Sequence, residues 1–200
     1  MATRGVIARP AGNGWEGRYH HWDSYPSGLG KTLWDAYHRF FRRDIDAMTS
    51  YLIDQHPAGW STIVGADLTL PPGFTEHGNS RFGDYSKGLI TWEEYRNLPQ
   101  NRRPQCYCHG DRNEPEQLIT HDQDPVDLEW AYVLSPTSMT VLISVPTTWD
   151  DPALNGRTPT EFDIKWNLRP LKWVVAGVVD WDGPEPAWET LVRAEVEHTW

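Results

Sequence analysis

The alternation of apolar and polar positions in the first 55 residues predicts a β-hairpin followed by amphipathic helices. Residues 3–9 and 16–22 alternate as strands do, and the turn cluster 11–14 lies between them. Apolar residues then recur at three- and four-residue spacing, first between Leu29 and Phe41 and again over 44–55. Ser27 is the expected N-cap of the first helix. The second should end where proline and glycine follow, at 56–59.

The last third of the chain predicts more strands. Residues 129–134 and 140–145 flank a Ser-Pro-Thr-Ser turn and indicate a second hairpin. The stretch 172–180 is the most continuous apolar run, which favours a central strand buried on both faces. A final helix is expected over 186–198. The order favours an α+β fold, in which a mostly antiparallel sheet, made of the N-terminal hairpin plus three C-terminal strands, packs against two to four helices.

The 200 residues are expected to form a single domain, 1–200, with long irregular excursions at about 65–90 and 99–127. Loops of this length inside a compact domain are uncommon and often functional.

Composition narrows the class of protein. A net charge of −10 argues against general nucleic-acid binding, which needs a surplus of lysine and arginine. No apolar run approaches the length of a membrane span, and the N-terminal residues lack the apolar core of a secretory signal. Because Cys106 and Cys108 are the only cysteines and lie too close to staple a fold, reduced thiols and a cytoplasmic location are expected.

The densest group of reactive side chains is Tyr-His-His-Trp-Asp-Ser-Tyr at 19–25, where a predicted strand leads into a helix. Helix N-termini favour anions, which makes this junction a candidate ligand site. We expect His21 to transfer protons as a catalytic residue and Asp23 to orient it. The expected ligand-binding residues are Tyr19, Trp22, Tyr25, Gly28, Gly30 and Lys31. The alternative is that the acidic and hydroxyl groups only cap the helix while the rings pack.

Residues 28–32, Gly-Leu-Gly-Lys-Thr, partly match a phosphate-binding loop. That motif needs a glycine five residues before Gly30, where Tyr25 stands, and Pro26 removes an amide that would contact phosphate. A helix entered through flexible glycines is therefore the favoured interpretation.

A second candidate site offers soft and borderline metal ligands. The set is Cys106, Cys108, His109 and His121. Zinc accepts two thiolates and two imidazoles in a tetrahedron, but paired cysteines usually have two or more residues between them and here have one. A buried strand carrying reduced thiols is the alternative.

The segments 1–7 and 19–30, with their M-x-T-R and H-W-D-x-Y-P-x-G-x-G patterns, resemble a family of uncharacterised proteins from actinobacteria and bacteriophages. Residues 129–134 are also similar to that group, and the match is good over about the first 35 residues. The resemblance implies a bacterial or phage origin and brings no activity with it.

Together these features favour a protein that binds a small anionic or nucleotide-like ligand in a His/Asp/Tyr/Trp pocket. Such a pocket could carry out acid–base chemistry of the kind that hydrolases use, and the sequence does not decide whether the protein is an enzyme. The alternative is a phage- or mobile-element-associated interaction module whose partner is a bacterial protein, since an excess of Trp and Tyr suits interfaces. A third hypothesis is a fold stabilised by zinc.

Overall fold

The computed structural model describes residues 3–70, 72, 103–109, 116–123 and 125–191. It confirms an α+β fold built on a mostly antiparallel sheet. The sheet has eight strands and also contains parallel pairs, so it is larger than the predicted set. Among the described residues, no helix is long and apolar enough to cross a membrane.

The expected N-terminal hairpin and the three C-terminal strands form most of this sheet. The strands are β1 (Gly5–Ala11), β2 (Gly14–His20), β3 (Trp60–Thr62), β4 (Gln105–Cys106), β5 (Ile119–Thr120), β6 (Trp130–Leu134), β7 (Ser138–Pro146) and β8 (Leu171–Asp180). Their order is β4-β3-β2-β1-β6-β7-β8, with β5 beside β2. β1 pairs in parallel with β6, so the two hairpins join into one sheet.

The two predicted amphipathic stretches are helical. Residues 26–40 form a continuous run with α1 (Lys31–Asp35) between two π-helical turns, η1 (Pro26–Gly30) and η2 (Ala36–Phe40). The second run is α2 (Ile45–Thr49) followed by η3 (Ser50–Asp54). Short 3-10 turns are η6 (Tyr107–His109) and η7 (Pro152–Leu154), and α4 is Glu161–Trp166.

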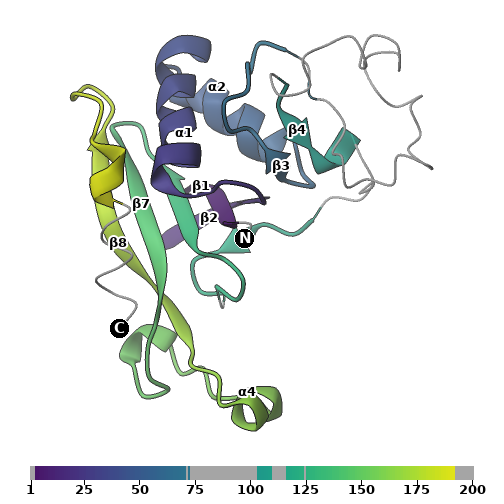
Figure 1. Ribbon diagram of the computed structural model, residues 1–200, viewed down its shortest axis with the longest axis vertical. Coiled ribbons are helices and arrows are strands. Elements are labelled where there is room, and N and C mark those ends of the chain that lie inside the picture. The colour runs from purple at the N-terminus through teal and green to yellow at the C-terminus, as the bar shows by residue number, and fades with distance from the viewer. Residues whose placement is uncertain (1–2, 71, 73–102, 110–115, 124, 192–200) are drawn as a thin grey trace.

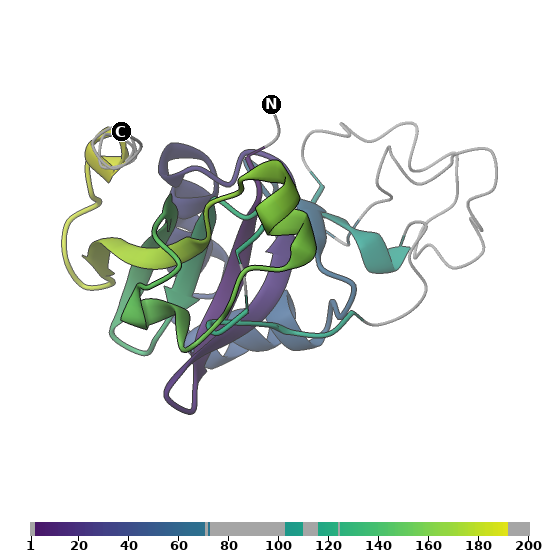
Figure 2. The ribbon, with the colours of Figure 1, turned by 90° about the horizontal axis from the view of Figure 1, so that it is seen from below.

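The two faces of the sheet have separate cores. α1 and α2 cover one face (Figure 1) and form the larger core with alternate residues of the strands, such as Ile7, Tyr132 and Val141. The opposite residues, among them Val6 and Trp15, form a smaller core on the other face. We call these the helix face and the outer face. α4 lies in the connection between β7 and β8, at the end of these strands away from α1 and α2 (Figure 1), and Figure 2 shows the molecule from that end.

Two sequence-based expectations need correction. The prediction that residues 172–180 form a central strand is wrong, because β8 lies at the edge of the sheet. Two of its side chains, Val175 and Val178, are 61% and 64% exposed. Ser27 does not cap the first helix, which begins two residues earlier than expected, with Pro26 at its first position and Tyr25 as N-cap. The structure also contains a helix that the sequence pattern did not predict, α4, whose Thr160–Asp163 capping box is encoded locally.

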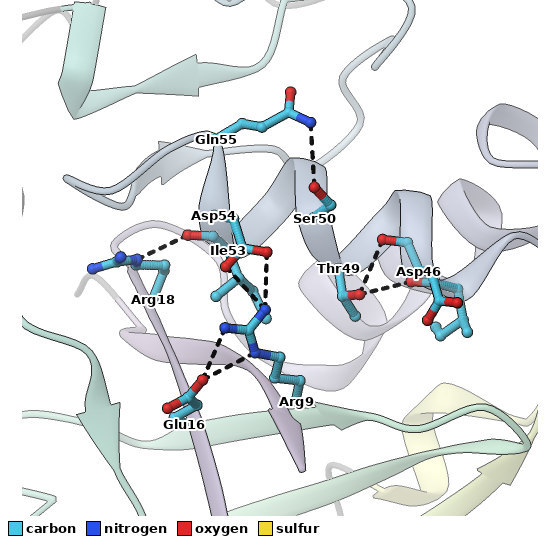
Figure 3. Close-up of polar contacts among 10 residues, drawn as sticks. Arg9, Glu16, Arg18, Asp46, Thr49, Ser50, Ile53, Asp54 and Gln55 are labelled. Atoms are coloured by element: carbon cyan, nitrogen blue, oxygen red, sulfur yellow. Dashed lines mark hydrogen bonds and ion pairs between the residues drawn. The ribbon is translucent and has the colours of Figure 1, made fainter. Parts of the chain in front are cut away.

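Charged side chains fasten the first hairpin to the second helical run (Figure 3). Arg9 bridges Glu16 and Asp54, with its Nη2 and Nη1 atoms 2.9 Å from the respective carboxylate oxygens. Arg18 donates from Nε to the Ile53 carbonyl oxygen at 2.9 Å. These contacts fix the end of η3 against β1 and β2, and so fix where His56 emerges.

Trp60 connects this helical run to the sheet. Its backbone is paired with His20 on one side and Cys106 on the other, and its fully buried indole donates Nε1–H to the Leu52 carbonyl at 2.8 Å. A buried carbonyl that loses its donor costs about 1–3 kcal/mol.

We therefore expect Trp60→Phe to lower the free energy of unfolding by about 2–4 kcal/mol, since it removes both the hydrogen bond and ring volume. Urea unfolding followed by far-UV circular dichroism measures this. The matched control is Trp166→Phe on α4, where the ring is 59% exposed, with an expected change within about 0.5 kcal/mol. Equal losses in the two variants would contradict the role assigned to Trp60.

Candidate functional site

Three side chains of the predicted ligand cluster lie together at the end of β2. The Tyr19 hydroxyl and His21 Nδ1 are 2.5 Å apart, and the His21 and Trp22 rings meet edge to face with centroids 4.5 Å apart. Tyr19 also stacks on Tyr107, at 6.4 Å between centroids. Tyr19, His21 and Trp22 thus form one aromatic group.

Asp23 and Tyr25 occupy a tight corner beyond this group. Asp23 is exposed, has φ +58°, and uses its carbonyl oxygen to accept from the Leu29 amide. Because the Tyr19 hydroxyl is bonded to His21 Nδ1, a tyrosine stands at the nitrogen where an orienting carboxylate was expected. The Tyr25 ring lies next to Gly28, where a Cβ would approach it to 3.1 Å.

The glycines and lysine after this corner belong to the helix packing. A Cβ on Gly30 would lie 3.0 Å from Trp188 and 3.1 Å from Tyr132. Lys31 Nζ forms ion pairs with Asp35 at 3.0 Å and Glu185 at 3.1 Å. Two carboxylates therefore occupy the position where a phosphate-binding lysine would meet its ligand. The small-ligand site at this junction stays a prediction.

His20, the neighbouring histidine, is a structural residue. Its Nε2 accepts the Ile63 amide at 3.2 Å, so the neutral ring carries its proton on Nδ1 and donates it to Ser24 Oγ at 2.7 Å. The Ser24 hydroxyl lies 3.3 Å from the His20 carbonyl and donates to it. Both residues are fully buried, so this Ser–His pair braces the corner rather than facing a substrate.

A different group brings metal-ligating atoms together, and it spans 50 residues of sequence. His56 Nδ1 lies 3.2 Å from Cys106 Sγ, and the ligand atoms of His56, Cys106 and Cys108 all lie within 4.8 Å of one another. We call these three residues the thiol–imidazole centre. His56 follows the η3 helical turn, and the cysteines come from β4 and the turn after it.

Local geometry explains why the two cysteines meet. Cys106 ends β4 and Cys108 lies in the 3-10 turn that follows directly, where a side-chain hydrogen bond joins the two sulfurs. Tyr107, between them, stacks on Tyr19. Gly59, at φ +75°, lets the 56–60 turn pass against β2, since a Cβ there would lie 2.8 Å from the Tyr19 carbonyl oxygen. That turn carries the Ala58 amide, which donates to Cys108 Sγ at 3.2 Å.

The electrostatics of the centre favour a thiolate. Hydrogen bonds from the Cys106 thiol, from His56 and from the Ala58 amide hold the pKa of Cys108 well below its usual value, although burial opposes them. His56 itself packs against two aromatic rings, with its centroid 4.9 Å from that of Tyr51 and 4.3 Å from that of Trp60. The imidazole is therefore held in place before any ligand binds.

Comparisons with protein-family models, with curated proteins and with solved structures give no match for this chain. Its function is therefore inferred from the geometry of the molecule alone.

The thiol–imidazole centre contains His56, whereas the metal set predicted from the sequence contained His109 and His121. His121 lies beside Trp15, whose carbonyl oxygen accepts the His121 amide at 3.1 Å. Trp15 is five residues, or about 16 Å of strand, from the His20 end of β2 where β3 and β4 pair. The side chain of His109 lies outside the described residues.

The described residues thus contain a cluster able to hold a metal, and it consists of both predicted cysteines plus His56. Sequence spacing could not reveal His56, because a histidine before Pro-Ala-Gly has the ordinary features of a helix end. Only the pairing of β3 with β4 brings residue 56 to residue 106.

The buried His20 predicts a pH-dependent stability. Burial, with a smaller effect of His21, lowers the pKa of His20 to about 3, against an ordinary value of 6.5. The unfolded chain then binds the proton more readily than the folded one, so stability is full above about pH 6.5 and is lost as pH falls toward 3. The slope from this residue reaches about 1.4 kcal/mol per pH unit.

Urea unfolding between pH 7 and pH 4 measures the effect by comparing the wild type with His20→Gln. The variant should lose stability less steeply with falling pH, because glutamine does not titrate. His121→Gln, at an exposed histidine, should keep the wild-type slope. Parallel slopes in wild type and His20→Gln would refute the assignment.

Proposed function

We propose that this protein binds zinc through His56, Cys106 and Cys108, and that the ion fastens the β3–β4 edge of the sheet to the end of the second helical run. The observation that carries the proposal is the convergence of two thiols and an imidazole, from segments 50 residues apart, within 4.8 Å. Soft thiolate and imidazole ligands select zinc over magnesium or calcium.

The spacing of the ligand atoms suits a tetrahedral ion. With Zn–S near 2.3 Å and Zn–N near 2.0–2.1 Å, ligand atoms in a tetrahedron lie about 3.6–3.8 Å apart. The separation of 3.2 Å between His56 Nδ1 and Cys106 Sγ needs only a small opening to admit the ion. Three protein ligands leave one coordination position for a further donor.

The surroundings support a negatively charged centre. Arg18 is half-buried near it, and the charge of Cys108 partly offsets the lowering of the Arg18 pKa by burial. Tyr51 packs on His56. Burial, together with the charge of Cys106, raises the pKa of Tyr51 to about 12. Its hydroxyl is buried with no hydrogen-bond partner in the described part of the chain, so a donor is available beside the thiolates.

Elemental analysis of protein prepared with zinc tests the proposal. We expect about one zinc per chain in the wild type and a clear loss in His56→Gln and Cys108→Ser, because each removes a ligand. Cobalt substitution supplies a second readout, since thiolate ligation gives charge-transfer absorption. At a hundredfold excess over its Kd, the ion should stabilise the fold by about 2.7 kcal/mol, and a chelator should remove this gain.

His121→Gln is the matched control. It should retain the wild-type zinc content, since His121 is exposed and lies at the other end of β2. Loss of zinc in this variant with retention in His56→Gln would reverse the assignment. Wild-type protein that binds no zinc and gains no stability from it would refute the site altogether.

A second candidate function is binding to another protein through α4, and a specific surface favours it. Four large apolar side chains on and just after this helix are between 44% and 68% exposed: Phe162, Ile164, Trp166 and Leu168. The Phe162 and Trp166 rings lie 6.2 Å apart, and Lys165 Nζ is 5.5 Å from the Trp166 ring. Clustered exposed aromatics with a nearby cation are typical of interface anchors.

The double variant Phe162→Ser with Trp166→Ser separates this function from stability. Because both rings are mostly exposed, we expect the free energy of unfolding to change by less than about 1 kcal/mol. Quantitative mass spectrometry of proteins captured from a bacterial lysate should show a stoichiometric partner with the wild type and its loss with the variant. The same proteins captured at the same levels by both would exclude α4 as the contact.

A further inference from the structure

β8 lies at one edge of the sheet, and in the described part of the chain no strand pairs with its free side (Figure 1). β7 pairs with the other side along the whole length of β8. An edge strand presents a row of unpaired N–H and C=O groups, which is a template for pairing with a further strand. The thiol–imidazole centre belongs to the opposite edge of the sheet, at β4, so the two features are independent.

The sequence of β8 lacks the residues that usually protect a free edge. Natural proteins place lysine, proline or an inward-pointing charge on such strands. Between Trp173 and Val179 the chain reads Trp-Val-Val-Ala-Gly-Val-Val, with neither a charge nor a proline. Two of these side chains, Val175 and Val178, are 61% and 64% exposed. The edge is therefore long, apolar and uncovered.

A β-bulge places both exposed valines on the outer face of the sheet. The register between β7 and β8 shifts by one residue at this point, and Ala176 is the extra residue. In a regular strand, residues three apart would point to opposite faces. Here Val175 lies opposite Leu142 and Val178 opposite Thr140, which are alternate residues of β7. Leu142 belongs to the outer core, so both valines share that face.

The helix face of the same stretch is already covered. Val174 and Ala176 pack against the larger core, and a Cβ on Gly177 would lie 2.6 Å from the Leu191 side chain. The exposed apolar surface is therefore confined to the outer face and the free edge of β8.

The charges at the two ends of β8 are opposite. Arg169, just before the strand, and Asp180, its last residue, are both exposed, and neither forms an ion pair with another described residue. Antiparallel pairing of two copies brings the Arg169 end of each copy to the Asp180 end of the other. Parallel pairing would bring like charges together, which is destabilising. The charge pattern therefore favours a second copy in antiparallel orientation.

We propose that this edge is a homodimer interface, in which β8 of two copies pairs antiparallel about a two-fold axis between Ala176 and Gly177. In this register Val175 of each copy lies directly opposite Val178 of the other, so all four exposed valines are covered at once. A two-fold interface requires a surface that is complementary to itself, and β8 meets that requirement in both its apolar side chains and its end charges.

Sedimentation-velocity ultracentrifugation of the full chain tests the proposal. We expect the wild type to dimerise between about 1 and 100 µM, since a single pair of edge strands buries a small interface. Two double variants, Val175→Lys with Val178→Lys and Val175→Glu with Val178→Glu, put like charges opposite each other. Each should weaken dimerisation by about tenfold or more. Because both valines are exposed, these variants should fold, which circular dichroism checks.

An equimolar mixture of the double-lysine and double-glutamate variants tests the register itself. Opposite charges then face each other at both valine pairs, so the mixture should form a 1:1 heterodimer at least about tenfold tighter than either variant with itself. The matched control is Val126→Lys, at a valine that is 62% exposed in the turn before β6. It should dimerise like the wild type.

Four results would overturn the proposal. A wild type that stays monomeric up to about 500 µM would leave the edge to a strand of another protein. Unchanged dimers in both double variants would move the interface elsewhere. A mixture of the two variants that stays monomeric would contradict the antiparallel register, and an equal loss in Val126→Lys would show an effect of charge alone.

Discussion

The arrangement of this molecule depends on Trp60, whose backbone joins β2 to β4 while its indole holds the second helical run. β3 has only three residues, too few to be stable alone, so its place in the sheet rests on that buried side chain. With Trp60 in this position, the turn before it places His56 against the indole ring, and the neighbouring strand β4 places Cys106 beside the Trp60 backbone. The thiol–imidazole centre is thus a consequence of how one tryptophan is anchored.

The alternation of side chains across the sheet decides which residues can cooperate. Tyr19, His21 and Tyr107 belong to the outer side of the β2–β3–β4 edge, whereas Trp60 and Cys106 are part of the core on the helix face. The aromatic group and the thiols are therefore close along the strands but separated by the sheet. For this reason the aromatic group and the thiol–imidazole centre are two separate clusters on the two faces of the sheet.

Sequence periodicity predicted the elements that are long enough to show a pattern: both hairpins and both amphipathic helical runs. It missed β3 and β5, since strands of two or three residues carry no period. β4 includes Cys106, where a buried strand was the alternative interpretation of the cysteine pair. It placed β8 in the centre because hydrophobicity reports apolar side chains and not which neighbours cover them, and Val175 and Val178 are exposed. For the metal cluster it identified both cysteines but not His56, whose position depends on a strand pairing between residues far apart in sequence.

His121 also shows that sequence spacing does not reveal which residues meet in the fold, since this predicted zinc ligand lies away from the cysteines. Its chemistry suits zinc, and it comes soon after the cysteines in sequence, yet β5 pairs with β2 at Glu16 and Gly17 and carries it toward Trp15. There the imidazole rests on Gly14, at the only kind of residue that leaves room for it. Residue type therefore limits what a side chain can do, while strand register decides which partners it meets. In this chain strand register places His56 beside the thiols and His121 beside Trp15, on the opposite face of the sheet.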